Sequence, residues 1–164
     1  MNTLAPGWLS EVDILGMPTL AHNRRAPHDY HILEKFEAGL VLSGAEVKSA
    51  KAGHLSLQGA YVIPKGTELW LTGTRIAAYP PAKGSSLSQD PERDRKLLLR
   101  RAELSYLSAK LRQGGLTLVP LSVYTAHRFV KVEIGLARGK TRYDKRVSLR
   151  KRETDREIRR TLKR

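Results

Sequence analysis

The fold is decided by the segment LTLVPLSVYTAHRFVKVEIGLA, which covers residues 116–137. In its second half, from Val130 to Leu136, apolar side chains alternate with polar ones or glycine. A period of two is typical of a strand with one buried face. The first half carries apolar residues on both of its alternating faces. We therefore expect two consecutive strands at 116–124 and 128–137.

Further strands precede this pair. Tyr30 to Phe36 shows the same alternation, and two short apolar runs within 60–71 are separated by Pro64-Lys65-Gly66-Thr67. Such a break between apolar runs indicates a hairpin. A further short apolar run, 76–79, closes this region before a Pro/Gly/Ser-rich loop at 80–89.

Two helices are expected between the strands. Residues 44–53 follow a possible N-cap, Ser43, and end at Gly53. Asp90-Pro91 combines an N-cap residue with proline at the first helical position, and leucines at three- and four-residue spacings follow as far as Leu111. This pattern predicts a long helix from Asp90 to Gly114-Gly115.

About five strands with a helix before the last pair predict a mainly β protein, built as a small OB-type antiparallel barrel with inserted helices. We expect the barrel at 23–137, after a loosely ordered leader at 1–22. A basic tail at 138–164 follows it. The 164 residues suit one such domain.

The charge of the chain favours a polyanionic partner. Thirty Lys and Arg against 16 Asp and Glu give a formal net charge of +14. The tail alone holds 13 basic and four acidic residues, and very few apolar ones. Such a segment buries too little surface to offset the entropy of ordering, so we expect it to be disordered alone and helical when bound.

Several function classes are disfavoured. No cysteine is present, which removes disulfide frameworks and thiolate zinc sites. No apolar run approaches the length of a membrane span. The chain also lacks G-x-S-x-G, P-loop and G-x-G-x-x-G patterns. We expect no catalytic residues, metal, cofactor or membrane partner, and we expect a cytoplasmic monomer.

Six segments, in order, resemble the SmpB family of SsrA-binding proteins, over about residues 23–164. They are NRRAPHDY (23–30), FEAGLVLSGAEVKSAKAG (36–53), DPERDRKLLL (90–99), GLTLVPL (115–121), VKVEIGLARGK (130–140) and YDKR (143–146). The resemblance implies an RNA-binding adaptor for trans-translation, the rescue of stalled bacterial ribosomes. Members bind the tRNA-like domain of transfer-messenger RNA, and their tail enters the vacant messenger channel of the ribosome.

The resemblance and the local charge together suggest two groups of functional residues. The RNA-binding candidates are Asn23, Arg24, Arg25, His28, Glu37, Lys48, Lys51, Leu98 and Arg100. The candidates for the decoding centre and messenger channel are Gly139, Lys140, Tyr143, Asp144, Lys145 and Arg146. Some of them have a structural alternative: Leu98 as helix core, Lys48 and Lys51 as a solvated helix face, Glu37 as a solvated strand end and Gly139 as a strand-ending glycine. Lys131 is read as a solvated strand lysine.

Two other functions stay open on composition and fold alone. A general RNA chaperone or ribosome-associated OB-fold protein would share the basic charge, the tail and the absence of cysteine. A hydrolase acting on RNA is the third class, and only cleavage of labelled RNA would reveal it. Preference for transfer-messenger RNA over bulk tRNA separates the adaptor from the general RNA chaperone.

Overall fold

The computed structural model describes residues 17–78 and 90–162. Within them the strands are β1 (Thr19–His22), β2 (Tyr30–Leu40), β3 (Leu55–Ser56), β4 (Tyr61–Lys65), β5 (Glu68–Thr72), β6 (Arg75–Ile76), β7 (Arg95–Leu98), β8 (Thr117–Ala126) and β9 (Phe129–Gly139). The helices are α1 (Ala26–Asp29), α2 (Gly44–Lys51), α3 (Arg101–Arg112) and α4 (Arg142–Leu162).

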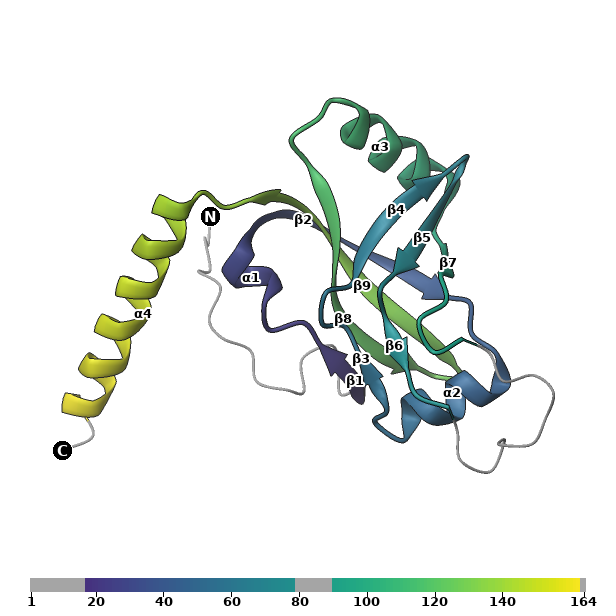
Figure 1. The fold of residues 1–164 in the computed structure, drawn as a ribbon, viewed down its shortest axis with the longest axis horizontal. Helices are drawn as coiled ribbons and strands as arrows, with labels where there is room; N and C mark the ends of the chain where they lie inside the picture. The colour runs from purple at the N-terminus through teal and green to yellow at the C-terminus, as the bar shows by residue number, and fades with distance from the viewer. Residues whose placement is uncertain (1–16, 79–89, 163–164) are drawn as a thin grey trace.

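Six strands close into a barrel. The main sheet has the order β1-β8-β4-β5-β7-β2-β9, and an additional pairing of β8 with β9 joins its two sides into a ring. All pairings are antiparallel. The short strands β3 and β6 pair separately. Figure 1 shows α3 near one end of the barrel and α2 near the other. The mainly β, closed antiparallel architecture predicted from the sequence is confirmed.

Alternation along β9 builds one wall of the core. Val130, Val132 and Ile134 are buried, whereas Lys131 and Glu133 between them stay half exposed. Strand β8 differs, because eight of its ten residues are buried. Its first face lines the barrel, and Val119 and Leu121 on the second face form a small cluster with α1. The dense apolar sequence of β8 thus reflects burial on both faces.

The predicted helix at 44–53 is confirmed as α2. Ser43 adopts an extended conformation, and its hydroxyl accepts from the Glu46 amide while Glu46 accepts from the Ser43 amide. This reciprocal capping box starts the helix. Gly53, at φ +86°, follows the helix end in a conformation that side chains disfavour. The hairpin is also confirmed, although its strands continue through Pro64 and Lys65, so that Gly66-Thr67 forms the turn.

The long helix predicted from Asp90 is wrong in its first half. Asp90 instead caps a turn, accepting from the Glu92 amide at 2.9 Å, and residues 95–98 form strand β7. The alternating burial of this strand sends Leu97 into the barrel and Leu98 outward. Helix α3 starts only at Arg101. There the predicted leucine spacing holds, because Leu104, Leu107 and Leu111 all pack on the core.

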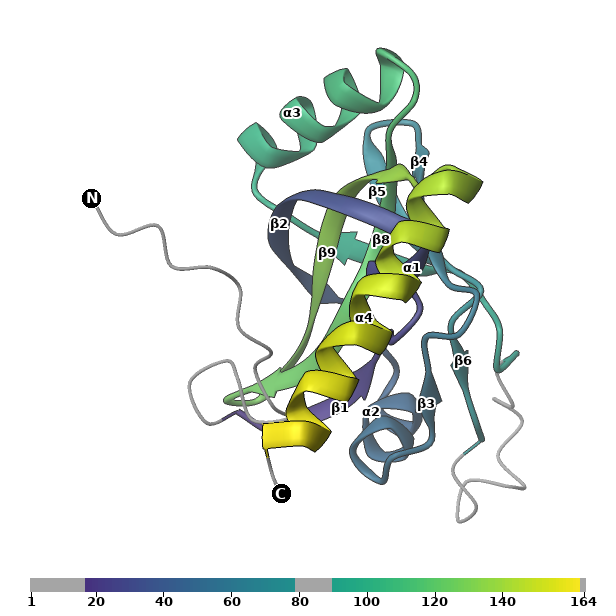
Figure 2. The same cartoon turned by 90° about the vertical axis from the view of Figure 1, so that its left-hand side faces the viewer.

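The ends of the barrel also differ from the expected boundaries. Residues 19–22, expected in the leader, form β1 and pair with β8. Strand β9 runs two residues beyond the expected start of the tail. The remaining leader, residues 1–16, and the predicted 80–89 loop lie outside the described residues. Helix α4 follows β9 and projects away from the barrel, with its first turn beside α1 (Figures 1 and 2).

Candidate nucleic-acid interface

Glu37 lies on the outer face of the barrel wall formed by β2, β9 and β8. Its carboxylate accepts hydrogen bonds from the Lys131 ammonium and the Tyr124 hydroxyl. These two bonds hold the pKa of Glu37 below its ordinary value despite partial burial. Burial and the neighbouring carboxylate raise the pKa of the Tyr124 phenol, so that it remains a donor. Glu37 is therefore an ionised hydrogen-bond acceptor. Lys131 and Tyr124 fix its orientation, and its carboxylate remains accessible to solvent.

Leu98 lies on the same outer face. It is 53% exposed, so the alternative reading as helix core is wrong. Opposite it on β2 is Gly39, where an added Cβ would come within 3.3 Å of the Leu98 Cβ. Gly39 also pairs with Lys131 on its other side. The absence of a side chain at Gly39 thus lets Leu98 lean across β2 toward the Glu37–Lys131 pair.

Arg100 follows directly after this strand. Its side chain is exposed, and its amide donates to the Glu103 carboxylate at 3.0 Å, which fixes the start of α3. Because only Leu99 separates Arg100 from Leu98, a cation stands at the edge of the outer face. Glu37, Leu98 and Arg100 therefore belong to one surface.

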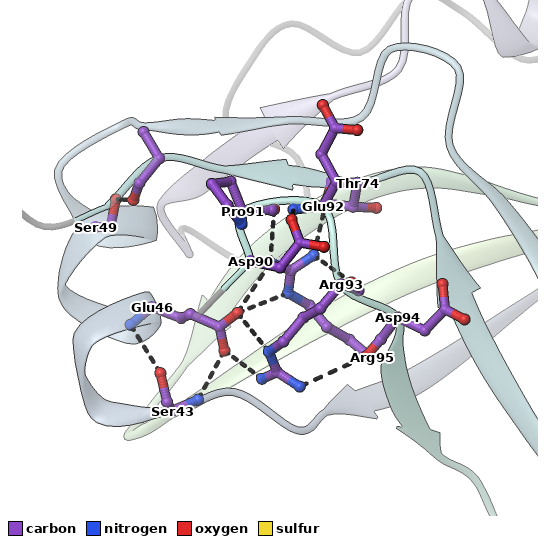
Figure 3. A network of polar contacts seen from close by, with 11 residues as sticks. Ser43, Glu46, Ser49, Thr74, Asp90, Pro91, Glu92, Arg93, Asp94 and Arg95 are labelled. Carbon is purple, nitrogen blue, oxygen red and sulfur yellow. Dashed lines mark hydrogen bonds and ion pairs between the residues drawn. The ribbon is translucent and has the colours of Figure 1, made fainter. Parts of the chain in front are cut away.

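Lys48 and Lys51 are exposed on α2, one turn apart. A buried polar network attaches this helix to the start of β7 (Figure 3). Glu46, on the inner face of α2, accepts from the Arg93 Nε and the Arg95 Nε at 3.0 Å each. Arg95 is fully buried and also donates to the backbone carbonyls of Thr74, Arg93 and Pro91.

The charges of this network are matched. Burial is the largest influence on the Glu46 pKa and raises it, but the bonds from Arg93 and the Ser43 amide and the charge of Arg95 together outweigh it. The pKa of Glu46 therefore lies below its ordinary value. Burial lowers the pKa of Arg95, but a guanidinium starts so far above neutrality that it stays charged. The network thus fixes the basic face of α2 relative to β7.

The Asn23–His28 segment forms a tight turn into α1. The Asn23 amide group donates to the Pro120 carbonyl at 2.9 Å, and its oxygen accepts from the Arg25 and Ala26 amides. Asn23 therefore has a structural role, whereas the side chains of Arg24 and Arg25 are exposed. His28 Nδ1 lies 3.0 Å from the Asp29 carboxylate.

A groove of about 750 Å³ runs beside this turn. Arg24 and Arg25 contribute to its lining, together with residues of β1 and the 55–58 segment. Its lining is mixed, with both polar side chains and apolar ones such as Leu55 and Leu57. A concave surface next to two exposed arginines suits a phosphate backbone better than an apolar ligand.

The tail begins against the same turn. Lys140 donates from its backbone amide to the Asp29 carbonyl at 2.9 Å and from its ammonium to the Pro27 carbonyl at 2.8 Å. Lys145, in the first turns of α4, lies 3.0 Å from the Asp29 carboxylate. This lysine and His28 hold the pKa of Asp29 below its ordinary value. The start of α4 is therefore attached to α1 by backbone and charge contacts.

Asp144 has a local role in the same junction. Its carboxylate accepts from the Thr141 hydroxyl at 2.7 Å and from the Thr141 amide at 3.1 Å, and its own amide donates back to that hydroxyl. These bonds cap α4 and lower the pKa of Asp144. Arg146 is exposed, and Gly139 ends β9 opposite Tyr30. Tyr143 lies in α4, but its side chain is outside the described atoms.

Apart from Lys48 and Lys51 on α2, the candidates fall into two surfaces linked by the β2–β9 ribbon. We call the outer face around Glu37, Leu98 and Arg100 the barrel surface, and the region of residues 23–29 and 139–146 the tail junction. Gly139 lies six residue positions along β9 from Glu133, the partner of Glu37. At about 3.4 Å per residue this corresponds to about 20 Å. The two surfaces are therefore distinct.

Several contributing residues escaped the sequence reasoning. Lys131, expected to be a solvated strand lysine, is paired with Glu37, and Tyr124 and Asp29 contribute without any sequence signal that marks them. Arg95 was hidden within an expected helix. The sequence R-K-L-L has no alternation of polar and apolar residues, so the inward position of Arg95 is visible only in the burial pattern of β7. The Lys145–Asp29 contact joins residues 116 positions apart, and no local pattern predicts it.

The described part of the chain offers neither a metal site nor a membrane-spanning helix. Among residues 17–78 and 90–162, no group of three or more His, Asp or Glu side chains is placed to hold a metal ion. No helix in the same part of the chain combines the length and apolar composition needed to cross a bilayer.

Comparisons with known proteins give one consistent result. Residues 20–164 match the family model described as SmpB protein. An SsrA-binding protein of Thermobifida fusca is 50% identical over 149 residues, which cover 91% of this chain and 92% of that protein. One from Streptococcus equi subsp. zooepidemicus is 49% identical, covering 88% and 92%.

A solved structure is similar to this chain in both sequence and fold. It is described as "tmRNA-SmpB: a journey to the center of the bacterial ribosome", and one of its chains is 48% identical, with a TM-score of 0.62. The match covers 79% of this chain and 93% of that one. Since a family model and relatives near 50% identity each span most of the sequence, the chain belongs to the SmpB protein family.

Proposed function

We propose that this protein binds the tRNA-like domain of transfer-messenger RNA through its barrel and delivers it to stalled ribosomes for trans-translation. The observation that carries the proposal is the separation of the barrel surface from the basic helix α4 at opposite ends of the β2–β9 ribbon. The barrel surface serves the RNA, and α4 serves the ribosome. The relatives named SsrA-binding protein support RNA as one partner. The similar solved structure, whose description names the bacterial ribosome, supports the ribosome as the other partner.

The barrel surface has the chemistry of an irregular RNA site. Exposed Leu98 offers an apolar contact to a base or ribose, Glu37 accepts from base donors, and Arg100 contacts a phosphate. Proteins recognise RNA by shape, unstacked bases and phosphates. The exposed lysines 48 and 51 on α2 extend the phosphate-binding area, with their helix held by the Glu46–Arg95 network. Arg24, Arg25 and His28 contact phosphates near the tail junction.

The tail is proposed to occupy the vacant messenger channel. Residues 149–162 are all exposed, and the charges of α4 are mainly positive. A helix without a buried face gains its stability from a partner. A channel lined by ribosomal phosphates supplies that partner only when the message is absent. Gly139 and Lys140 position the tail, and Tyr143, Asp144, Lys145 and Arg146 act in the decoding centre.

The protein then acts as an adaptor without chemistry of its own, as a monomer in the cytoplasm where ribosomes work. The chemistry belongs to its partners, because its contribution is binding energy and placement. Incubating the protein and labelled RNA with divalent metal ions is expected to leave the RNA intact. Cleavage in a metal-dependent manner would instead indicate a hydrolase.

The function is tested by competition. Labelled tRNA-like domain is bound to the protein at physiological salt, and unlabelled transfer-messenger RNA or bulk tRNA is added. We expect transfer-messenger RNA to displace the label at a concentration at least ten-fold lower than bulk tRNA does. Equal displacement by both RNAs, with a steep salt dependence, would identify a general RNA chaperone.

A further inference from the structure

Phe129 is the most exposed aromatic side chain among the described residues, at 70%. It begins β9 at the tip of the β8–β9 hairpin, where Ala126 pairs with Phe129 and leaves His127-Arg128 as the turn. No ring or cation contact of Phe129 exists within the described part of the chain. A phenylalanine so exposed loses the hydrophobic stabilisation that burial would provide, unless a partner covers it.

The direction of Phe129 follows from the register of β9. Val130 and Val132 are buried in the barrel, and Phe129, Lys131 and Glu133 alternate with them on the outer face. Lys131 pairs with Gly39, which in turn pairs with Leu98. Strand spacings of about 4.8 Å and a rise of about 7 Å per two residues place Phe129 roughly 12 Å from Leu98. Phe129 thus continues the barrel surface.

The hairpin tip is held in a defined shape. A two-residue hairpin turn needs a positive φ at its first central residue, which glycine or asparagine usually supplies. Here His127 adopts φ +54°, and it is the one non-glycine residue with positive φ in the described ranges. The tight turn keeps Arg128 and Phe129 at the exposed end of the paired strands. Because the backbone that carries Phe129 is already ordered, only the side-chain rotamers of Phe129 lose conformational entropy when a partner stacks on the ring.

We propose that Phe129 is a stacking platform for an unpaired base of the tRNA-like domain, with Arg128 contacting an adjacent phosphate. The proposal rests on the proposed function and extends its barrel surface to the hairpin tip. An RNA base fits because exposed Arg128, next to the ring in sequence, supplies positive charge, and because unpaired bases stack on aromatic rings. The barrel surface would then contact the RNA through two apolar side chains, Leu98 and Phe129.

The test uses full-length protein and a tRNA-like-domain transcript carrying 2-aminopurine at single unpaired positions. Alanine substitution at a stacked aromatic residue weakens binding by about 1–3 kcal/mol per base, which is about 5- to 150-fold. We expect Phe129→Ala to weaken binding within this range and to abolish the 2-aminopurine fluorescence change at one position. Phe129→Trp should retain both the affinity and the fluorescence change. Tyr61→Ala removes an aromatic ring that is 47% exposed on β4 and should change neither.

A salt titration separates stacking from charge. Phe129→Ala should leave the slope of log affinity against log salt unchanged, whereas Arg128→Ala should reduce it by about 0.7–0.9. Unchanged melting temperatures would show that both variants fold. Wild-type affinity of Phe129→Ala for a transcript that the wild-type protein binds selectively would overturn the proposal. Normal RNA binding with lost ribosome engagement would also overturn it, by assigning Phe129 to the ribosome. Failure of the wild-type protein to prefer the transcript would contradict the proposed function instead.

Discussion

At the scale of single residues, the carboxylate of Glu46 connects the fold to the interface. It receives bonds from two arginines and one backbone amide, and it joins α2 to β7. The Ser43 cap was predictable from sequence because capping is local. The Arg95 partner was not, because Asp90-Pro91 and the following leucines favour a helix, and only the closed barrel imposes a strand there.

Replacing Glu46 with Gln tests the network through pH. The buried Arg95 would lose its counter-charge, so we expect the free energy of unfolding at pH 7 to fall by about 3 kcal/mol. Because the Glu46 pKa is depressed from 4.5, its stabilisation is present above that pH and is lost as pH falls through the lower, folded-state value. Chemical denaturation should therefore show that the difference in unfolding free energy between the wild type and Glu46→Gln is smaller at pH 3 than at pH 7. A constant difference would contradict this assignment.

Glu37 gives a residue-level test of RNA contact. Glu37→Ala raises the net charge by one, which by electrostatics alone strengthens RNA binding. We expect weaker binding instead, by about 5- to 150-fold, because a base donor loses its acceptor. Glu153→Ala, at an exposed position of α4, makes the same charge change and is the matched control. Stronger binding by both variants would show that Glu37 makes no specific contact.

At the scale of elements, strands with strict alternation were predictable and strands made of helix-forming residues were not. Strands β2, β8 and β9 and the β4–β5 hairpin follow from apolar periodicity and turn residues. The four residues of β7 are too few, and too uniform in pairs, to show an alternation of apolar and polar residues. Pairing across the barrel is non-local, so the shared surface of Glu37, Leu98 and Arg100 emerged only from the register.

Helix α4 supports an element-level prediction. Its residues from 149 to 162 are all exposed, so its helicity depends on the Thr141–Asp144 cap and on hydrogen bonds within the helix itself. Isolated helices with so little tertiary support are marginal in water. We expect backbone NMR of the free protein to show coil-like averaging for residues 147–164. Amides there that resist exchange like those of β9 would mean that α4 is stable without the ribosome.

At the scale of the whole molecule, charge is unevenly distributed. Residues 138–164 carry a net +9 of the total +14, whereas the much longer 23–137 segment carries +7 and residues 1–22 carry −2. This uneven distribution was predictable from sequence, whereas the attachment of the tail to α1 by Lys140 and Lys145 was not. Under the proposed function, the ribbon between the two surfaces keeps the RNA site and the ribosome site about 20 Å apart.

The uneven charge predicts different salt responses. Selective binding of the tRNA-like domain should depend on salt with a slope that reflects the few phosphates at the barrel and turn. Removing α4 cations, for example by Arg156→Gln and Arg159→Gln together, should leave that slope within about 0.3 of wild type if α4 does not touch this RNA. A slope reduced by about 1.5 would place both arginines on the RNA.

The separation of roles is tested most directly by truncation after Lys140, which keeps β9 and the Lys140–Asp29 bond. Binding of transfer-messenger RNA and peptide tagging on stalled ribosomes are measured on the same truncated protein. The account predicts RNA affinity close to that of the full chain together with loss of tagging. Equal loss of both activities, with the barrel still folded, would show that the tail holds the RNA and would contradict it.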